Sequence, residues 1–338
     1  MAAAPQRTGG AKPRSRSAPA RGEALDRGAD ALRRPLRPFL KWAGGKRQLL
    51  PALRPYYPAH FGTYHEPFLG SGAVFFDLAS LGALRPCRVR LTDVNGDLIG
   101  CWRQLRDRPD AVIAQLHNLA AERLASPEEH YYQVRDDWFN PRRARILDGG
   151  SWAERYTTDL AAMLIYLNRT GFNGLFRVNS QGLFNVPRGR YKNPRICDER
   201  NLRRTSEALS ALEAVVDYAP YETVLDVARP RDFVYLDPPY APLSTTASFT
   251  SYTPDRFDAD AQRRLQEVVI RLAKRRCHVV LSNSTAPEIA ALYDGNAEVE
   301  QAGIRAYKVP ARRAINSNAT RRGPIQEYVI TNVARAPG

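Results

Sequence analysis

The sequence predicts an α/β protein with an open sheet that binds a ligand at its carboxyl edge. Three stretches indicate this fold. Residues 233–236 form an apolar, β-branched and aromatic run typical of a buried strand, and Asp237-Pro238-Pro239-Tyr240 ends it. Residues 64–76 read as a strand, a glycine turn and a helix, and residues 89–93 read as a second strand. Open α/β sheets bind their ligands where the parallel strands end.

The turn after residue 236 brings three different chemical groups together. Two consecutive prolines remove two backbone donors and fix two φ angles, so the chain must leave the sheet here. The carboxylate of Asp237, the carbonyl of Pro238 and the ring of Tyr240 are then expected at the carboxyl edge. A proline turn that only ends a strand is the alternative interpretation.

Residues 39–46 are the first motif of the folded part. Two glycines stand between an aromatic residue and Lys46, and they allow the backbone to approach a ligand closely. The spacing is not that of a Walker phosphate loop. We therefore expect a ligand-binding loop of another kind.

The next motif predicts a site for an adenosine-like ligand. The glycine turn after Glu66 contains Gly70 and Gly72 and leads directly into an apolar helix. Asp93 ends the second strand about twenty residues later, the offset at which an acid typically binds ribose hydroxyls. Asp93 could instead cap a helix that begins near Gly96.

Composition indicates a polyanionic partner. The chain has 338 residues, with 50 Lys and Arg against 35 Asp and Glu, and a formal net charge of +15. A protein this basic usually binds nucleic acid. The four cysteines form no C-x-x-C pair and the five histidines form no metal-spaced cluster, so we expect reduced thiols and no metal. We find no apolar run of membrane-spanning length and no signal peptide, and we expect a cytoplasmic protein.

Residues 98–208 interrupt the alternation of strands and helices. They begin with a helical pattern and continue into residues 167–179 and 184–192, which are dense in Arg, Asn, aromatic residues and Gly. Arg reads guanine, Asn reads adenine, and aromatic rings stack on or wedge between bases. The segment predicts DNA recognition, with a solvated hairpin as the alternative. The basic residues 1–34 and 305–322 are candidates for phosphate contact.

The groups at the carboxyl edge suit a reaction that needs no protein nucleophile. The sequence contains no Ser-His-Asp set and no cysteine in a helix-start motif. Direct methyl transfer from S-adenosylmethionine to an exocyclic amine is such a reaction. Asp237 and the Pro238 carbonyl would accept the two N–H bonds of the amine, and Tyr240 would stack on the base. The base must be flipped out of the duplex to reach such a pocket.

Several long motifs in one order resemble the Dam-type DNA adenine-N6 methyltransferases, and the resemblance covers nearly all of residues 39–332. The motifs are F-L-K-W-A-G-G-K, E-P-F-x-G-x-G, L-N-R-x-G-[FY]-N-G-L-x-R-x-N, F-N-V-P-x-G-R-Y-K and D-P-P-Y-x-P-L-S. The resemblance implies a Rossmann-like class I methyltransferase sheet with an inserted, mainly helical DNA-recognition domain that bears a β-hairpin. It implies an S-adenosylmethionine-binding catalytic domain (35–97 and 209–338) and a target-recognition domain (98–208). The tail over residues 1–34 departs from the family, and its Ala-, Pro-, Arg- and Gly-rich composition predicts a disordered basic segment.

The resemblance also assigns residues to roles. S-adenosylmethionine, with S-adenosylhomocysteine as product, would be bound without a metal by Trp42, Lys46, Glu66, Gly70, Gly72, Asp93, Val94, Tyr221 and Asp237. The target adenine would be held by Asp237, Pro238 and Tyr240. In members that methylate GATC, the recognition hairpin bears residues that match Asn173, Leu175, Arg177 and Pro187, and Lys41, Phe172 and Tyr191 complete the DNA-binding set. Phe172 replaces the family's usual tyrosine, and Arg188 stands where an aromatic residue is common.

The leading interpretation is a GATC-type adenine methyltransferase of double-stranded DNA. It would be cytoplasmic and nucleoid-associated in a prokaryote, or encoded by a phage, with no membrane and no obligate protein partner. The second interpretation keeps the chemistry and changes the substrate to another DNA site or to RNA. The third is a non-catalytic DNA-binding regulator, which predicts decay of Asp237, Tyr240 or the glycine turn, and all three are intact.

Overall fold

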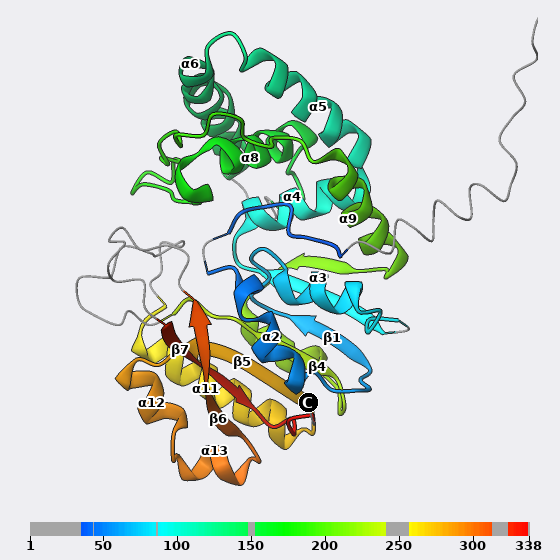
Figure 1. Cartoon of the computed structure of the whole chain (residues 1–338), viewed down its shortest axis with the longest axis vertical. Helices are drawn as coiled ribbons and strands as arrows, with labels where there is room; N and C mark the ends of the chain where they lie inside the picture. Colours follow the sequence, from blue (N-terminus) through cyan, green and yellow to red (C-terminus); the bar gives the residue numbers. More distant parts are fainter. Residues whose placement is uncertain are drawn as a thin grey trace, which may run out of the picture. The chain divides into compact units, whose positions relative to one another are not determined.

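The fold is described from a computed structural model of the chain (Figure 1). The structure describes residues 35–42, 44–85, 87–147, 153–240, 257–312 and 324–336. The tail predicted over residues 1–34 and the arginines of the basic segment beyond residue 312 lie outside the described residues.

One seven-stranded sheet forms the centre of the described chain, in the order β3-β2-β1-β4-β5-β7-β6. The strands are β1 (Thr63–Glu66), β2 (Arg88–Asp93), β3 (Val215–Tyr218), β4 (Phe233–Leu236), β5 (His278–Ser284), β6 (Arg305–Arg312) and β7 (Pro324–Thr331). Strands β1 to β5 pair in parallel, and β7 runs antiparallel to both β5 and β6. The Rossmann-like α/β sheet predicted from the sequence is confirmed.

The order of the strands places the ligand crevice. Chain order reverses between β1 and β4, which are neighbours in the sheet. Helices that follow two such strands leave in opposite directions, and this opens a crevice at the carboxyl ends. Glu66 ends β1, Asp93 ends β2, and Asp237 follows β4 directly. Three acids predicted to bind the cofactor therefore lie at this edge.

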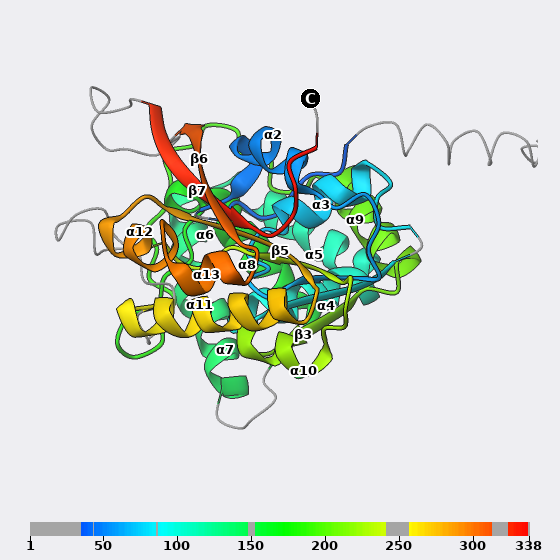
Figure 2. The ribbon, with the colours of Figure 1, turned by 90° about the horizontal axis from the view of Figure 1, so that it is seen from below.

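Helices cover both faces of the sheet and also form a separate group. They are α2 (Leu50–Leu53), α3 (Ala73–Ser80), α4 (Gly96–Asp107), α5 (Pro109–Glu122), α6 (Pro127–Tyr132), α7 (Asn140–Leu147), α8 (Thr158–Thr170), α9 (Glu199–Ala211), α10 (Val224–Val227), α11 (Ala259–Lys274), α12 (Pro287–Tyr293) and α13 (Ala297–Gln301). Figure 2 shows α2 and α3 on one side of the sheet and α10 and α11 on the other. A π-helical turn, Gln133–Phe139, joins α6 to α7.

Alternation along β4 divides its side chains between two hydrophobic cores. Phe233 and Tyr235 pack into the core beneath α3, whereas Val234 and Leu236 pack into the core beneath α11. All four side chains are buried, as predicted for this strand. Asp237 continues the alternation, so its side chain is directed to the face that also holds Tyr235.

Helices α4 to α9 stand between β2 and β3 in the chain and form the upper part of Figure 1. Helix α8 is buried on nearly every side, because α4, α5 and the residues that follow α8 in the chain pack around it. The predicted division at residues 97/98 and 208/209 falls inside α4 and α9, which run from one part into the other. The assignment of 98–208 as a separate recognition domain stays a prediction.

The predicted hairpin is an irregular antiparallel ribbon, residues 171–189. Two isolated bridges join its arms, Gly171 to Arg188 and Val178 to Phe184. The amide of Phe172 donates to the Pro187 carbonyl at 2.8 Å. Because glycine and polar residues alternate irregularly along both arms, the ribbon forms no regular strand.

Two strands were missing from the sequence prediction. Residues 305–312, interpreted only as a basic phosphate-contact segment, form edge strand β6, and Val215–Tyr218 form the other edge strand, β3. Edge strands carry charged residues that prevent further pairing, and this weakens their sequence pattern. The alternative that Asp93 caps a helix is wrong, because the helix cap of α4 is Asn95, which accepts from the Leu98 amide.

Candidate active site

Asp237 lies at the centre of a polar cluster at the carboxyl edge. Its Oδ1 is 2.8 Å from the Lys46 ammonium and accepts a hydrogen bond from the Ser282 hydroxyl at 3.0 Å. Ser282 is also bonded to the Tyr235 hydroxyl at 3.0 Å. Burial raises the pKa of the Asp237 carboxyl, and Lys46 and Ser282 act against that rise. These two contacts hold one oxygen of the carboxylate and thereby orient the other.

Tyr240 is held through its hydroxyl and through one face of its ring. Its hydroxyl donates to Glu327 Oε2 at 2.8 Å, and the Lys46 ammonium lies 4.3 Å from the centre of its ring. Pro238 lies between Asp237 and Tyr240, and no hydrogen-bond donor among the described residues meets its carbonyl. The structure therefore brings together the carboxylate, the carbonyl and the ring predicted to hold a base.

Glu66 is fully enclosed beneath the same edge. The Tyr64 hydroxyl donates to its Oε2 at 2.8 Å, and the Phe75 amide donates to the same oxygen at 3.1 Å. Burial raises the pKa of the Glu66 carboxyl to about 8, and the charge of Asp237 adds to the rise. A buried carboxyl that is largely protonated at neutral pH is a group whose charge a ligand can change.

Asp93 is poised for polar contacts at the end of β2. Its two oxygens accept from the Gly70 amide at 3.0 Å and from the Asn95 amide at 2.9 Å. Burial raises its pKa to about 6, although these amides favour the carboxylate. Each oxygen keeps a lone pair for a further donor. The neighbouring Val94 is 41% exposed, so apolar surface lies beside the acid.

The first motif lies beside the glycine turn. Gly70 has φ +47°, and a Cβ there would come within 3.2 Å of Trp42 Cδ1, so only glycine allows this approach. On its other side, Trp42 stacks on Phe176 of the ribbon with ring centres 5.7 Å apart. Tyr221, expected near the cofactor, stacks on Phe68 at 5.0 Å.

The residues predicted to bind DNA gather on the ribbon and at its base. Lys41 lies with its ammonium 4.1 Å from the centre of the Tyr191 ring. Burial and the nearby Arg169 lower the pKa of Lys41. Phe172 is 49% exposed, and Asn173 adopts φ 53°, a left-handed conformation unusual for a residue other than glycine. The turn that carries Phe172 and Asn173 thus lies beside Lys41 and Tyr191, because Gly174 packs closely against Lys41.

Arg177 is exposed on the first arm of the ribbon. Its Nε donates to Asn185 Oδ1 at 2.8 Å and its Nη2 to the Asn185 carbonyl at 3.3 Å. Leu175 is half-buried and packs against the main core. These bonds hold the guanidinium against the opposite arm.

Sequence reasoning missed three residues that position the site. Ser282 and Glu327 hold Asp237 and Tyr240, and Asn168 joins the first motif to the ribbon. Ser282 lies in β5 and Glu327 lies in β7, and neither residue belongs to a motif that indicates a functional site. Asn168 lies in a motif that we interpreted as DNA-binding, but a role in holding the chain leaves no separate signal.

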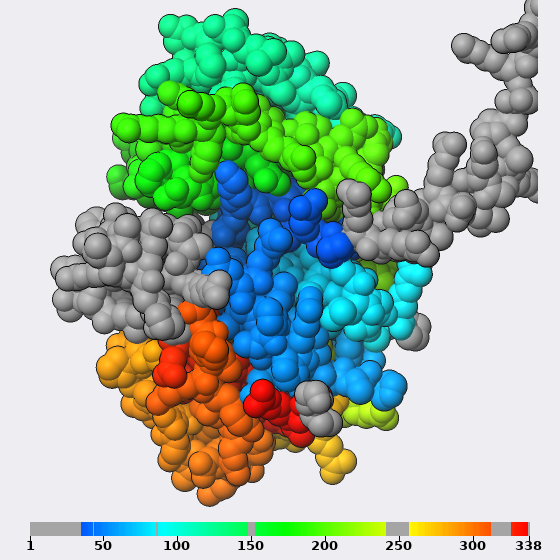
Figure 3. Space-filling view, viewed as in Figure 1, coloured from blue at the N-terminus to red at the C-terminus, as the bar shows by residue number. Residues whose placement is uncertain are grey.

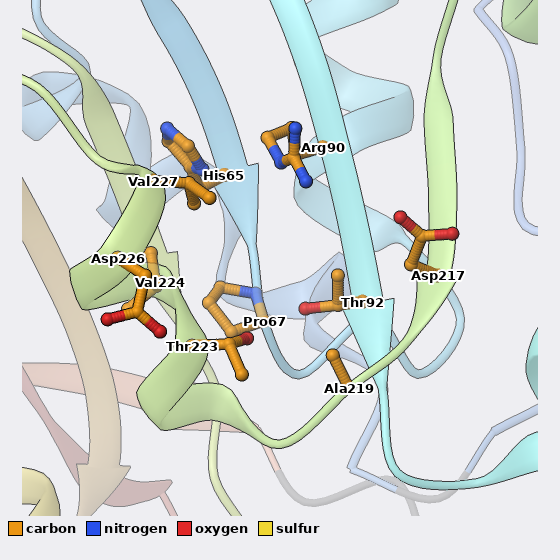
Figure 4. A pocket seen from close by; sticks show the side chains of 10 residues that line it. All are labelled: His65, Pro67, Arg90, Thr92, Asp217, Ala219, Thr223, Val224, Asp226 and Val227. Atoms are coloured by element: carbon orange, nitrogen blue, oxygen red, sulfur yellow. The ribbon is translucent and has the colours of Figure 1, made fainter.

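A separate hollow of about 190 Å³ lies against the other face of the sheet (Figure 4). It is lined by His65, Pro67, Arg90, Thr92, Asp217, Ala219, Thr223, Val224, Asp226 and Val227. None of the predicted site residues lines it, because side chains at successive positions of β1 and β2 point to opposite faces. The hollow is therefore distinct from the cluster around Asp237.

The described residues contain neither a metal-binding cluster nor a membrane-spanning helix. Within the described ranges, no group of three His, Cys, Asp or Glu side chains could hold a metal ion. In the same ranges, no helix has the length and apolar character that crossing a membrane requires.

Comparison with known proteins gives consistent matches along the chain. Residues 42–311 match the model of the D12 class N6 adenine-specific DNA methyltransferases. A type II methyltransferase of Lactococcus lactis subsp. cremoris is 39% identical, over 88% of this chain and 95% of its own. A type II methyltransferase of Methanocaldococcus jannaschii is 38% identical, over 88% and 99%. The DNA adenine methylase of Escherichia coli is 35% identical, over 87% and 94%.

The fold is that of a Rossmann-like methyltransferase. More narrowly, the chain belongs to the D12 class of N6 adenine-specific DNA methyltransferases. The predicted family is confirmed. Membership implies S-adenosylmethionine as methyl donor and DNA as substrate.

The residues present fit S-adenosylmethionine. Asp93 has lone pairs available for hydroxyl donors, Val94 offers exposed apolar surface for an aromatic ring, and Asp237 and Glu66 are acids suited to a cationic ligand. Gly70 and Asp93 are joined by a hydrogen bond, so the glycine turn and the acid form one cradle. This donor set is chemically complementary to such a ligand.

Proposed function

We propose that the protein methylates N6 of adenine in GATC sites of double-stranded DNA, with the target base flipped out of the duplex. The observation that carries the proposal is the arrangement around Asp237: a carboxylate oriented through one oxygen, an adjacent carbonyl and a fixed aromatic ring. Adenine has an exocyclic amine with two N–H groups and an aromatic ring. The two oxygen acceptors and the ring of the protein are complementary to them.

Each group of the chain has a distinct task in the proposed mechanism. Bound S-adenosylmethionine supplies an electrophilic methyl group. Asp237 and the Pro238 carbonyl accept hydrogen bonds from the two N–H groups of the amine. These bonds turn the nitrogen lone pair away from the ring system. Tyr240 stacks on the base, and Glu327 keeps its ring in place. Asp237 is in position to take the proton that the amine loses after transfer.

Lys46 favours the ionised form of Asp237 before the substrate enters. Its ammonium is 2.8 Å from Asp237 Oδ1 and donates to the Gly44 carbonyl at 2.6 Å, and the Lys46 side chain is 8% exposed. Because burial alone would favour the protonated acid, this cation opposes that effect. An ionised Asp237 can accept the N–H bonds that a protonated acid would accept less well.

The proposed target sequence, GATC, is inferred from residues of the ribbon. Asn173, Leu175, Arg177 and Pro187 match residues of family members that methylate GATC, and the fold brings them onto one ribbon beside Lys41 and Tyr191. A flipped base requires such residues to fill or support the gap left in the duplex. We propose Tyr191 for this wedging role.

The test is transfer of labelled methyl from S-adenosylmethionine to two short duplexes, one with GATC and one with the same bases scrambled. Label on adenine of the GATC duplex alone is the expected result. Label on both duplexes would retain the chemistry and discard the proposed roles of Asn173, Leu175, Arg177 and Pro187. Label on neither duplex, but on an RNA of the same base sequence tested as a third substrate, would favour the second interpretation.

Replacing Arg177 with alanine should weaken the preference for GATC by about 1–3 kcal/mol at one position of the site, the usual value for a lost bidentate base contact. The exposed guanidinium is free to leave Asn185 for a base, since both bonds to Asn185 lie at the surface. The measurement is kcat/KM on GATC and on all single-base variants of it. Arg263→Ala on α11 is the matched control, because it removes the same charge from an exposed position outside the ribbon. Unchanged discrimination in Arg177→Ala would rule out base reading by this residue.

A further inference from the structure

Asn168 joins two segments that are far apart in the sequence. Its Oδ1 accepts from the Lys41 amide at 2.7 Å, and its Nδ2 donates to the Lys41 carbonyl at 2.6 Å and to the Gly174 carbonyl at 2.9 Å. The side chain is 2% exposed. One buried amide therefore binds both the segment that leads to Trp42 and Lys46 and the turn that carries Asn173.

The chemistry of this contact requires an amide. An asparagine side chain supplies two N–H donors and one carbonyl acceptor, and the three hydrogen bonds of Asn168 use both donors and the acceptor. An aspartate of the same shape keeps the acceptor but loses both donors and places a charge against two carbonyls. A leucine of similar size satisfies none of the three backbone groups, and buried backbone groups left without partners are costly.

Close packing surrounds this contact. A Cβ at Gly174 would lie 2.4 Å from Lys41 Cβ, so the turn fits against Lys41 only as glycine. The Arg169 guanidinium donates to the Phe39 carbonyl at 2.6 Å, and Trp42 stacks on Phe176. In Figure 3 the blue residues that begin the described chain lie directly against the green residues of the insert. A shift of one segment must therefore move the other.

We propose that Asn168 is a positioning residue that couples cofactor binding to DNA recognition. The proposal rests on the proposed function, which assigns the cofactor to Trp42 and Lys46 and the DNA to Asn173 and its neighbours. A cofactor that orders the first motif also orders the turn through the two Lys41 bonds and the Gly174 bond. DNA that binds the turn returns the same free energy to the cofactor site, because coupling between two sites is reciprocal.

The test measures coupling and not affinity alone. The dissociation constant of a GATC duplex is measured by fluorescence anisotropy with and without saturating S-adenosylhomocysteine, which permits no turnover. We expect the unaltered protein to bind DNA at least about fivefold more tightly with this ligand, the lower end of usual coupling. In Asn168→Ala and Asn168→Asp, we expect a ratio within about twofold of one.

Asn140 provides the matched control. It is also a buried asparagine that binds the ribbon, since its Nδ2 donates to the Phe184 carbonyl at 3.0 Å and its Oδ1 accepts from the Phe184 amide at 2.9 Å. Among the described residues, its side-chain hydrogen bonds reach Phe184 and none reaches the first motif. Asn140→Ala should therefore weaken DNA binding in the presence and absence of ligand alike, and leave the ratio unchanged. If the ratio of DNA affinities with and without ligand falls equally in Asn168→Ala and Asn140→Ala, Asn168 has only a structural role.

A second measurement needs no variant and so does not depend on the folding of Asn168→Ala. In the unaltered protein, S-adenosylhomocysteine alone should slow hydrogen exchange in residues 172–176, which lie in the ribbon and outside the cofactor set. Unchanged exchange there, with ligand bound, overturns the coupling. Methyl transfer to GATC by a protein without coupling would refute only this inference, whereas no transfer to any DNA would refute the proposed function itself.

Discussion

Asp237→Ala should abolish methyl transfer and leave the affinity for GATC DNA within a few-fold of the unaltered protein. The carboxylate is the acceptor that orients the amine and takes its proton, and losing a positioned acid or base typically lowers a rate by about 10²–10⁴-fold. The residues proposed to contact DNA lie on the ribbon and at Lys41, and none of them is bonded to Asp237. The measurements are single-turnover methyl transfer and anisotropy with the same duplex.

Two further variants separate the chemistry of Asp237 from its packing. Asp237→Asn keeps the size of the side chain and an oxygen for Lys46 and Ser282, but it cannot accept a proton, so we expect it to be nearly as inactive as Asp237→Ala. Ser282→Ala removes one bond to Oδ1 and leaves the carboxylate, so we expect a loss of roughly 1 kcal/mol in transition-state stabilisation, the usual value of one hydrogen bond. Loss of DNA binding with normal methyl transfer in Asp237→Ala would contradict the assignment.

The strands of the site could be predicted because their signals are local. The run over residues 233–236 has the bounds of β4, and the strand that ends in Asp93 and the helix that begins at Gly96 are both present. Proline, glycine and apolar periodicity act within a few residues, so they can be read without knowledge of the fold. The acids at the carboxyl edge follow from these strand ends.

The contacts that orient the site could not be predicted in this way. Ser282 is 45 residues from Asp237 and Glu327 is 87 residues from Tyr240, and each meets its partner only because the strand order brings them together. A lone serine or glutamate within a strand carries no pattern of its own. The same holds for Asn168, which bonds Lys41 from 127 residues away.

The two missed edge strands show a different limit. Strand β6 contains Arg305, Lys308 and a proline, and these residues are typical of solvated or edge positions. Its pairing with β7 over the whole of both strands overrides the weak local preference. Charge alone therefore indicated a surface segment but not its secondary structure.

Glu66→Gln should stabilise the protein at neutral pH. The pKa of Glu66 is about 8 in the folded protein against 4.5 for an ordinary glutamate, so the folded state holds a proton that the unfolded chain releases. Stability from this group is complete below about pH 4.5 and declines as pH rises toward 8. Glutamine mimics the protonated acid and does not titrate, so the variant should gain about 3 kcal/mol over the unaltered protein at pH 7, at about 1.4 kcal/mol per pH unit.

The pH dependence of this difference provides its control. Urea unfolding of both proteins at about pH 4.5, 6, 7 and 8 should show free energies of unfolding that coincide at the lowest pH and diverge steadily above it. Every other titrating group is common to the two proteins, so the difference isolates Glu66. The Tyr64 and Phe75 bonds both reach one oxygen, and the glutamine carbonyl can accept both. A difference independent of pH would contradict the raised pKa.

The expected gain in stability bears on the function of the site. A carboxyl that lowers stability at neutral pH, and that lies beside Asp237, is suited to respond to a cation. A cationic cofactor at this edge would favour the ionised form of Glu66 and release its proton. Calorimetry at pH 7 in two buffers of different ionisation enthalpy should then detect proton release by the unaltered protein on binding S-adenosylmethionine. Release by Glu66→Gln should be much smaller, because only Asp93 and Asp237 remain to contribute, and this variant should also bind the cofactor more weakly. Equal proton release by both proteins would remove Glu66 from the cofactor set and leave it a buried acid of the core.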